Sequence, residues 1–217
     1  MRRDDSPPDT TAGKLPSEIP RKTVYRLSLY LRCLGLMATD RDPIVSSAAL
    51  AAVAGVQPAQ LRKDLAWCGP LGKRGTGYET AILRRRLEEV LGRASLQPVA
   101  LVGAGNLGQA LLSYRGFARE GFEIVAAFDL LPRKARSHRI PVQGMGELTA
   151  SVRRLDIRMA ILCVPGESAQ KVAEHLVDSG IHAILNFSPA VLQLPEKVAV
   201  NNVNLAIELE NLSYFAR

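Results

Sequence analysis

Three glycines in the middle of the chain have the spacing of a phosphate-binding loop. Gly103, Gly105 and Gly108 follow the apolar run Val99–Val102, which has the pattern of a strand buried on both faces. The first glycine permits a tight turn, the second removes a side chain that would block a pyrophosphate, and the third lets the next helix pack closely. Backbone N–H groups at the positive end of that helix would bind phosphate. The expected loop comprises Gly103, Ala104, Gly105, Asn106, Leu107 and Gly108.

A carboxylate follows this loop at the distance that a dinucleotide-binding fold requires. Asp129 ends a second apolar segment, 21 residues beyond Gly108. A carboxylate there can accept hydrogen bonds from both hydroxyl groups of the adenosine ribose and would repel a 2′-phosphate, so it favours NAD(H) over NADP(H). A lone G-x-G-x-x-G motif is a weak signal, because glycine-rich turns are common. Here strand, helix, second strand and acidic residue agree, and we predict an NAD(H) site.

These residues need a sheet to position them, and the second half of the chain supplies alternating strand and helix patterns. Further strand-like runs occupy residues 158–165, 181–187 and 197–200. A helix pattern at 167–179 ends before Gly180, a residue typical of helix ends. The alternation predicts a parallel sheet in an α/β Rossmann-like domain over residues 95–202. At the ends of its strands we place three more cofactor contacts, Val164, Pro165 and Asn186.

The last segment, residues 203–217, has the pattern of a helix that needs a partner. Leu205, Leu209, Leu212 and Phe215 recur at helical spacing, and Ile207 and Tyr214 widen the apolar surface. A helix that is apolar over so much of its circumference must be covered. Because a terminal helix can readily be domain-swapped with a second subunit, we expect a homodimer in which this helix is exchanged.

Composition limits the remaining possibilities. The chain has 217 residues, 47% of them hydrophobic, and a net charge of +7, which fits two modest globular domains. No apolar run reaches the ~18 residues that span a bilayer, and residues 1–19 carry Asp4, Asp5 and three prolines instead of a secretion signal. We expect a cytoplasmic protein with a disordered tail at 1–19. Three widely spaced cysteines, Cys33, Cys68 and Cys163, indicate buried thiols and neither a disulfide framework nor a metal site.

The positive charge is concentrated before the glycine loop. Residues 14–86 hold 13 Lys and Arg against 5 Asp and Glu, whereas residues 96–217 hold 12 against 11. Such an asymmetry is compatible with a solvated helix face or with nucleic-acid binding.

The basic segment has the pattern of a helix-turn-helix. One amphipathic helix is expected at 21–37, a second after the capping hydroxyls Ser46 and Ser47 up to Gly55, and a third from Gln57-Pro58 to Cys68. The last of these carries Gln60, Arg62 and Lys63 near its start, where a recognition helix reaches base edges and phosphates.

A glycine-rich basic loop follows, with flanks that could pair as a hairpin. Residues 71–78 place Lys73 and Arg74 at its tip, which suits the narrow minor groove of A·T-rich DNA; in isolation, a solvated surface hairpin would explain the same residues. After a helix-turn-helix, we interpret it as the wing of a winged-helix domain at 20–94. Arg84–Arg86, on a helix at 80–91, fit a solvated face as well as phosphate contacts. The expected DNA contacts are Ser46, Ser47, Gln60, Arg62, Lys63, Lys73, Arg74 and Tyr78.

From about Pro20 to Phe215 the chain resembles Rex, the bacterial redox-sensing transcriptional repressors. The matching stretches, in order, are residues 26–32, 45–47, 60–65, 75–78, 102–108, 126–129, 184–187 and 208–209. The resemblance implies a winged-helix domain, a Rossmann domain and a homodimer with exchanged C-terminal helices. It also implies repression of respiratory or fermentative genes from a palindromic operator, with release by NADH and tolerance of NAD+.

Two places depart from the family pattern. Where the family has Ser-Tyr-Phe after the recognition helix, this chain has Ala66-Trp67-Cys68, which we expect to serve packing; the other departure concerns the switch. The resemblance places Tyr114 near the nicotinamide and pairs Arg32 with a carboxylate from the partner's C-terminal segment, but that position is Asn204 in this chain. An amide can hydrogen-bond to Arg32 or Tyr114 but cannot neutralise a charge. We therefore expect Asn204 to contact the cofactor region, and this member either to separate NAD+ from NADH less sharply or to use a rearranged network.

Two alternatives compete with a DNA-binding regulator. An NAD-dependent oxidoreductase with an accessory domain needs a proton donor near the nicotinamide. Its candidates, His138, His175, His182 and Tyr114, are poorly placed or lack an orienting partner. A nucleotide-binding interaction protein that holds CoA or another adenine ligand is compatible with the glycines, but Asp129 and the winged-helix pattern argue against it.

Overall fold

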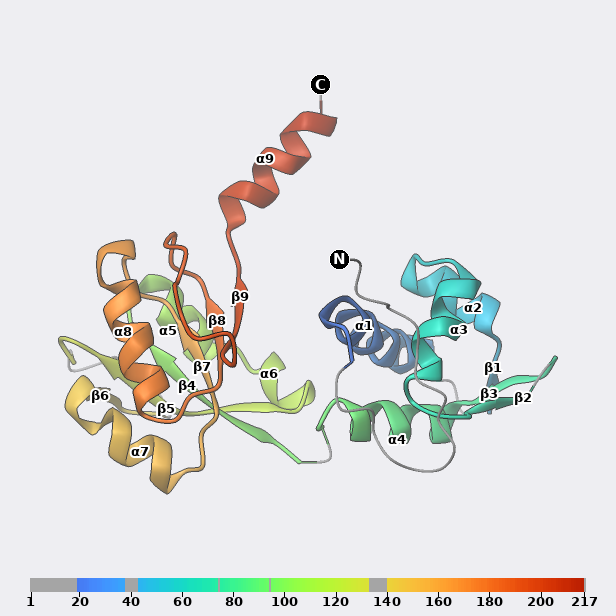
Figure 1. The fold of residues 1–217 in the computed structure, drawn as a ribbon, viewed down its shortest axis with the longest axis horizontal. Coiled ribbons are helices and arrows are strands. Elements are labelled where there is room, and N and C mark those ends of the chain that lie inside the picture. The colour runs from blue at the N-terminus through green and yellow to red at the C-terminus, as the bar shows by residue number, and fades with distance from the viewer. Residues whose placement is uncertain (1–18, 38–42, 74, 94, 133–139, 217) are drawn as a thin grey trace. The chain divides into compact units, whose positions relative to one another are not determined.

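The computed structural model describes residues 19–37, 43–73, 75–93, 95–132 and 140–216. The chain forms two compact units, Met1–Ser95 and Leu96–Arg217, which Figure 1 colours from blue to green and from green to red. Residues 1–18 of the tail expected at 1–19, the wing residue Arg74 and the loop residue His138 lie outside the described residues.

The first unit is a winged helix. Its helices are α1 (Arg21–Met37), α2 (Ser47–Ala54), α3 (Pro58–Ala66) and α4 (Thr80–Val90). Its strands β1 (Ile44–Val45), β2 (Gly72–Lys73) and β3 (Gly77–Glu79) form an antiparallel sheet in the order β1-β3-β2. The helix-turn-helix and the hairpin are confirmed, while the two-residue strand β1, which joins the hairpin from before α2, was not expected.

Local chemistry explains where these helices begin and end. The Ser46 hydroxyl accepts a hydrogen bond from the Ala49 N–H at 3.0 Å and caps α2, as expected for serine at this position. Gly55 ends α2 with φ +66°, a left-handed conformation that favours glycine. Pro58 occupies the first turn of α3, where its missing N–H costs nothing.

The core of this unit lies between α1 and the other three helices. Leu27, Leu34, Leu50, Leu61 and Leu83 are completely buried. On α1, Val24 is 38% exposed, whereas Thr23 and Tyr30 are buried. The Thr23 hydroxyl accepts a hydrogen bond from Arg26 at 3.3 Å, and the Tyr30 hydroxyl belongs to a hydrogen-bond cluster described below.

The second unit is a parallel sheet with helices on both faces. Its strands are β4 (Gln97–Val102), β5 (Phe122–Asp129), β6 (Val142–Gly144), β7 (Met159–Leu162), β8 (Ala183–Asn186) and β9 (Ala199–Asn202). They pair in the order β6-β5-β4-β7-β8-β9, and all pairs are parallel. The order reverses between β4 and β7, which is the doubly wound arrangement of dinucleotide-binding folds.

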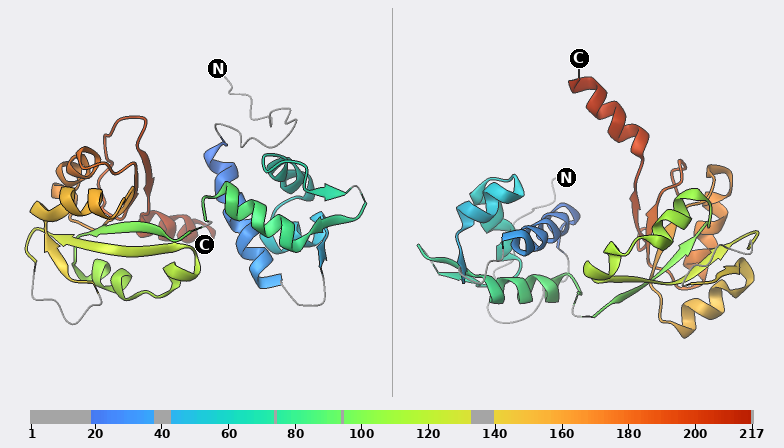
Figure 2. Two further views of the ribbon diagram at one scale, coloured as in Figure 1. Left: turned by 90° about the horizontal axis from the view of Figure 1, so that it is seen from below. Right: turned by 180° about the vertical axis from the view of Figure 1, so that it is seen from behind.

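Two apolar layers hold this sheet. The helices are α5 (Asn106–Ser113), α6 (Gly116–Arg119), α7 (Leu148–Arg154) and α8 (Gly166–Asp178), with a 3-10 turn at Met145–Glu147. Figure 2, left, shows α5 and α6 on one face of the sheet and α7 and α8 on the other. Leu148 and Leu176 belong to the cluster on one side, and Leu111 and Phe117 pack against the other. The predicted α/β Rossmann-like fold is confirmed, with β6 and α7 added.

The helix α9 (Leu205–Phe215) follows β9 and buries none of its residues. Leu209, Leu212 and Phe215 are 66%, 65% and 82% exposed, and Figure 1 shows α9 extending away from the sheet. The Asn204 side-chain oxygen caps this helix by accepting from the N–H groups of Ala206 and Ile207 at 3.0 and 3.3 Å. The expected apolar C-terminal helix is present.

The cysteines are free thiols. Cys33 and Cys68 are buried, as expected, whereas Cys163 is partly exposed. Burial raises the pKa of Cys68 and of Cys163 to about 11. Within the described residues, no three His, Cys, Asp or Glu side chains cluster as metal ligands, and no helix could cross a membrane.

Candidate nucleotide and nucleic-acid sites

The glycine loop connects β4 to α5, and its three glycines differ in the space around them. A Cβ atom on Gly103, which has φ +96°, would collide with the carbonyl of Cys163, and a Cβ on Gly108 would collide with the carbonyl of Gly103. A Cβ on Gly105 would meet no atom within 4 Å. The fold therefore requires Gly103 and Gly108, whereas Gly105 leaves open space in front of the loop.

A pocket lies beside this loop at the carboxyl ends of β4, β5 and β7. Five predicted cofactor residues line it: Gly103, Gly105, Asp129, Val164 and Pro165. Its volume is about 160 Å³, below the ~300–1,000 Å³ typical of sites that enclose a whole small ligand. The pocket as formed could enclose only part of a dinucleotide. Met145, Cys163 and Ser168 also line it and were not predicted. Met145 follows the strand β6, which was not expected either.

The Asp129 carboxylate is held by backbone donors on both oxygens. One oxygen accepts from the Ala104 N–H at 2.7 Å and the other from the Leu131 N–H at 2.9 Å. A carboxylate oxygen has two lone pairs, so each can still accept a hydroxyl from a ligand. Asp129 is therefore fixed at the mouth of the glycine loop.

Tyr114 lies away from this pocket. It ends α5, is 60% exposed, and its ring packs edge-on against Phe117 with centroids 5.0 Å apart. It lines a separate hollow with Phe117, Ile124 and Ile140. A shared cofactor site for Tyr114 and the glycine loop remains a prediction.

Asn186 is completely buried, and its amide is fully hydrogen-bonded within the protein. Its nitrogen donates to the Ala190 carbonyl at 3.0 Å and to Asn202 Oδ1 at 2.9 Å. Its oxygen accepts from the N–H and the hydroxyl of Ser188 at 3.0 and 2.7 Å. In this structure Asn186 ties β8 to β9, and all of its amide hydrogen-bonding capacity is used within the protein; its contact with a cofactor stays a prediction.

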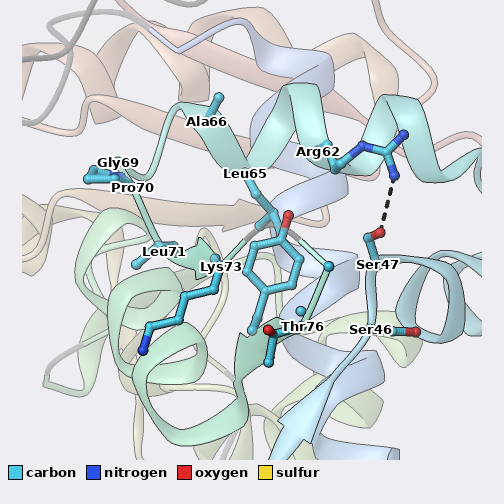
Figure 3. A pocket seen from close by; sticks show the side chains of 14 residues that line it. Ser46, Ser47, Arg62, Leu65, Ala66, Gly69, Pro70, Leu71, Lys73 and Thr76 are labelled. Atoms are coloured by element: carbon cyan, nitrogen blue, oxygen red, sulfur yellow. Dashed lines mark hydrogen bonds between the residues drawn. The ribbon is translucent and has the colours of Figure 1, made fainter.

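On the first unit, five predicted DNA contacts line one groove. Ser46, Ser47, Arg62, Lys73 and Tyr78 come from the start of α2, from α3 and from the hairpin. Figure 3 shows the Arg62 guanidinium reaching Ser47, to whose hydroxyl it donates at 3.1 Å, with Lys73 on the facing hairpin. The structure thus brings the recognition helix and the wing to one groove with two cationic side chains. Lys63 is exposed on α3 but does not line this groove.

Gln60 differs from its neighbours on α3, because its side chain turns toward a buried carboxylate. Asp64 is 1% exposed and accepts hydrogen bonds from Arg26 Nε at 2.6 Å, Arg26 Nη2 at 2.7 Å, the Tyr30 hydroxyl at 2.7 Å and Gln60 Nε2 at 2.9 Å. Burial works to raise the pKa of Asp64, but the hydrogen bonds from Arg26, Tyr30 and Gln60 prevail and lower it. Burial and the bond to Asp64 raise the Tyr30 pKa. Nothing in the local sequence pattern had indicated this cluster.

Two family models match the two units. The model described as "Putative DNA-binding protein N-terminus" matches residues 18–66, and the model described as "CoA binding domain" matches residues 95–190.

Curated relatives that match most of the chain are Rex proteins. The chain is 43% identical over 198 residues to the redox-sensing transcriptional repressor Rex of Streptomyces coelicolor, covering 90% of this chain and 77% of the relative. It is 41% identical over 223 residues to the Rex of Chloroflexus aurantiacus, covering 99% and 97%. The chain belongs to the Rex family of redox-sensing transcriptional repressors.

Solved Rex structures share the whole architecture. A structure of RSP, a Rex-family repressor, in complex with β-NAD+ and operator DNA superposes with a TM-score of 0.85 at 33% identity, covering 93% of this chain and 94% of that one. RSP in complex with β-NADH gives a TM-score of 0.79 at 32% identity, with coverage of 93% and 95%. Rex membership confirms the predicted family and the predicted class, a redox-sensing transcriptional regulator.

Proposed function

We propose that this Rex protein binds operator DNA through its winged helix, binds NAD(H) through its Rossmann-like unit, and leaves the operator when NADH replaces NAD+. The observation that carries the proposal is the match over 93% of the chain to RSP in complex with both β-NAD+ and operator DNA.

The groove in Figure 3 supports the DNA-binding half. Arg62 and Lys73 lie on opposite sides of it, on the recognition helix and on the wing. Lysine and arginine side chains bind phosphates and, when they reach a base edge, guanine. Ser46, Ser47 and Tyr78 supply hydroxyl groups for further phosphate contacts.

Asp129 supports NAD(H) as the ligand over its close chemical relatives. Its fixed carboxylate lies beside the loop expected to hold the pyrophosphate. NADP carries a 2′-phosphate and CoA a 3′-phosphate on the adenosine ribose, and the carboxylate would repel either. The CoA alternative, although the matching family model carries that name, is therefore disfavoured.

The exposed helix α9 supports a homodimer. Its apolar side chains are uncovered in the single chain, and a second subunit that exchanges the same helix would bury both copies. The two cofactor forms differ by one positive charge on the nicotinamide. A dimer with two geometries could couple that charge to the spacing of its DNA-binding units. We assign Arg32, Tyr114 and Asn204 to this switch.

The same site gives no support to catalysis. Among the described histidines, His175 lies in α8 and His182 precedes β8, and neither lines the glycine pocket. We propose that the bound dinucleotide is sensed and released unchanged.

One titration tests the proposal. The purified full chain is used to select a duplex from random-sequence DNA, and its affinity for this selected duplex is measured at fixed salt, because salt alone changes such affinities by orders of magnitude. We expect NADH to release the duplex at concentrations at which NAD+ has no effect. A selected duplex that ignores both cofactors would contradict the sensing half, and failure to enrich any duplex would contradict the DNA-binding half.

A further inference from the structure

The outward face of the recognition helix does not include Gln60. Ala59, Arg62, Lys63 and Ala66 are exposed on α3, whereas Leu61, Asp64 and Leu65 are buried. With about 100° of rotation per residue, Gln60 lies roughly 110° from the middle of the exposed arc, while Arg62 and Lys63 lie within about 50° of it. Gln60 is half-buried at the border of this face.

The Gln60 amide takes part in a cluster that joins α3 to α1. The Asp64 carboxylate binds Arg26 through both oxygens, at 2.6 and 2.7 Å, and also accepts from Tyr30 and Gln60. Arg26 and Tyr30 lie in α1, 38 and 34 residues before Asp64. The carboxylate therefore fixes α3 on α1, and with it the side chains that α3 presents outward.

The chemistry of Asp64 also fixes which way the Gln60 amide turns. An ionised carboxylate only accepts hydrogen bonds, so the amide nitrogen of Gln60 must face it. A glutamine that reads adenine uses its nitrogen and oxygen together on one base edge. To do so, Gln60 would have to withdraw its nitrogen from Asp64 and leave a buried acceptor with one donor fewer, which costs free energy.

We propose that Gln60 is a positioning residue of the recognition helix, and that Arg62 and Lys63, not Gln60, discriminate between bases. The inference rests on the proposed function, since it assumes that α3 reads the operator. It reassigns a residue that the sequence pattern had placed among the DNA contacts.

The test is a base-by-base comparison on the selected duplex. Each base pair is replaced in turn, and affinities are measured at fixed salt for wild type, Gln60→Met, Arg62→Met and Lys63→Met. Methionine keeps a long side chain without the polar head. We expect Gln60→Met to weaken binding to the selected duplex and to every substituted duplex by a similar factor, roughly three- to tenfold, with the wild-type pattern of preferences retained. Arg62→Met or Lys63→Met should become indifferent at a base pair that the wild type discriminates by tenfold or more.

A second variant tests whether the effect passes through Asp64. Tyr30→Phe removes another donor from the same carboxylate and changes no residue of α3. It should therefore produce the same uniform weakening. Thermal unfolding followed by far-UV circular dichroism checks that each variant keeps the fold of the first unit, and NADH affinity checks the other unit.

Three results would overturn the inference. Gln60→Met could lose discrimination at one base pair, which would make Gln60 a base reader. It could leave all affinities unchanged, which would make the amide structural only. Finally, the wild type could enrich no duplex, in which case the proposed function fails and the inference falls with it; the first two results leave the proposed function intact.

Discussion

The Asp129 carboxylate accepts a 2.7 Å hydrogen bond from the backbone N–H of Ala104, 25 residues earlier in the chain. The bond links the end of β5 to the glycine loop. Asp129 therefore has two tasks: it shapes the loop in the free protein, and it presents a negative charge where the adenosine ribose would bind. Neutralising it should affect both.

Asp129→Asn should bind NADH more weakly and reject NADPH less. A hydrogen bond to a charged group contributes about 1.5–3 kcal/mol, so we expect roughly a ten- to hundredfold loss for NADH and a smaller loss, or a gain, for NADPH. Fluorescence titration with both dinucleotides measures the ratio. Glu123→Gln, which neutralises another carboxylate on β5, is the matched control. An unchanged NADH to NADPH ratio in Asp129→Asn would contradict the assigned role.

Substitutions at Gly105 and Gly108 should separate binding from folding. Gly105→Ala adds a methyl group to open space, so its free energy of unfolding should stay within about 0.5 kcal/mol of wild type while NADH affinity falls. Gly108→Ala places a methyl group against a backbone carbonyl and should destabilise the protein by about 1–3 kcal/mol or more. Denaturant unfolding and NADH titration measure the two effects. Equal loss of stability in both variants would refute the distinction.

The Asp64 cluster predicts that the free energy of unfolding depends on pH in the acidic range. Because the folded-state pKa of Asp64 is lowered, its contribution is present above the unfolded carboxyl pKa near about 4 and is lost as the pH falls toward the folded value. Above pH ~5, Asp64→Asn should be less stable by about 3 kcal/mol, since it leaves Arg26 without its charged partner. The difference should shrink below pH ~4. Unfolding curves of both proteins from pH ~7 to ~3 measure it, and a difference that stays constant would exclude Asp64 as the titrating group.

A charge on the apolar face of α9 should separate the subunits. Leu209 is 66% exposed in the single chain, and Leu209→Glu would bury a carboxylate in the proposed interface at a cost of several kcal/mol. Sedimentation should give a dimer for wild type and a monomer for the variant at micromolar concentration. Glu210→Gln, on the same helix, should remain dimeric. Equal masses for wild type and Leu209→Glu would rule out α9 as the interface.

Asn204→Asp should sharpen the distinction between NAD+ and NADH. Aspartate caps a helix as well as asparagine does, so α9 should still begin at Leu205, and the variant adds only a charge. Asn204→Ser keeps a capping oxygen without the charge and serves as the control. Titration of all three proteins with both cofactors gives the affinity ratios. If the three ratios coincide, residue 204 does not take part in redox discrimination.

Regular patterns along the chain were sufficient to predict most of the fold. The alternating apolar runs gave five of the six strands of the large sheet, and capping residues such as Ser46 and Gly55 located the short helices. The strand β6 was missed because it has three half-buried residues at the edge of the sheet. The strand β1 was missed because it has two residues and exists only by pairing with β3.

The site was predicted less completely, because its side chains depend on contacts between distant segments. The loop glycines and Asp129 were identifiable, since backbone geometry dictates their types. Asp64 and Gln60 look like the solvated face of a helix until α1 is packed against them. Asn186 ends its strand as a cofactor ligand would, yet its amide is used up by Ser188, Ala190 and Asn202.

The glycine loop also constrains how this protein could evolve. At Gly103 and Gly108 the obstacle to any side chain is the backbone itself, which no compensating substitution nearby can remove. At Gly105 the expected obstacle is the dinucleotide. A descendant that ceased to bind its cofactor could therefore accumulate larger residues at position 105 while Gly103 and Gly108 persisted. Of the three loop glycines, only position 105 would then show that binding was lost.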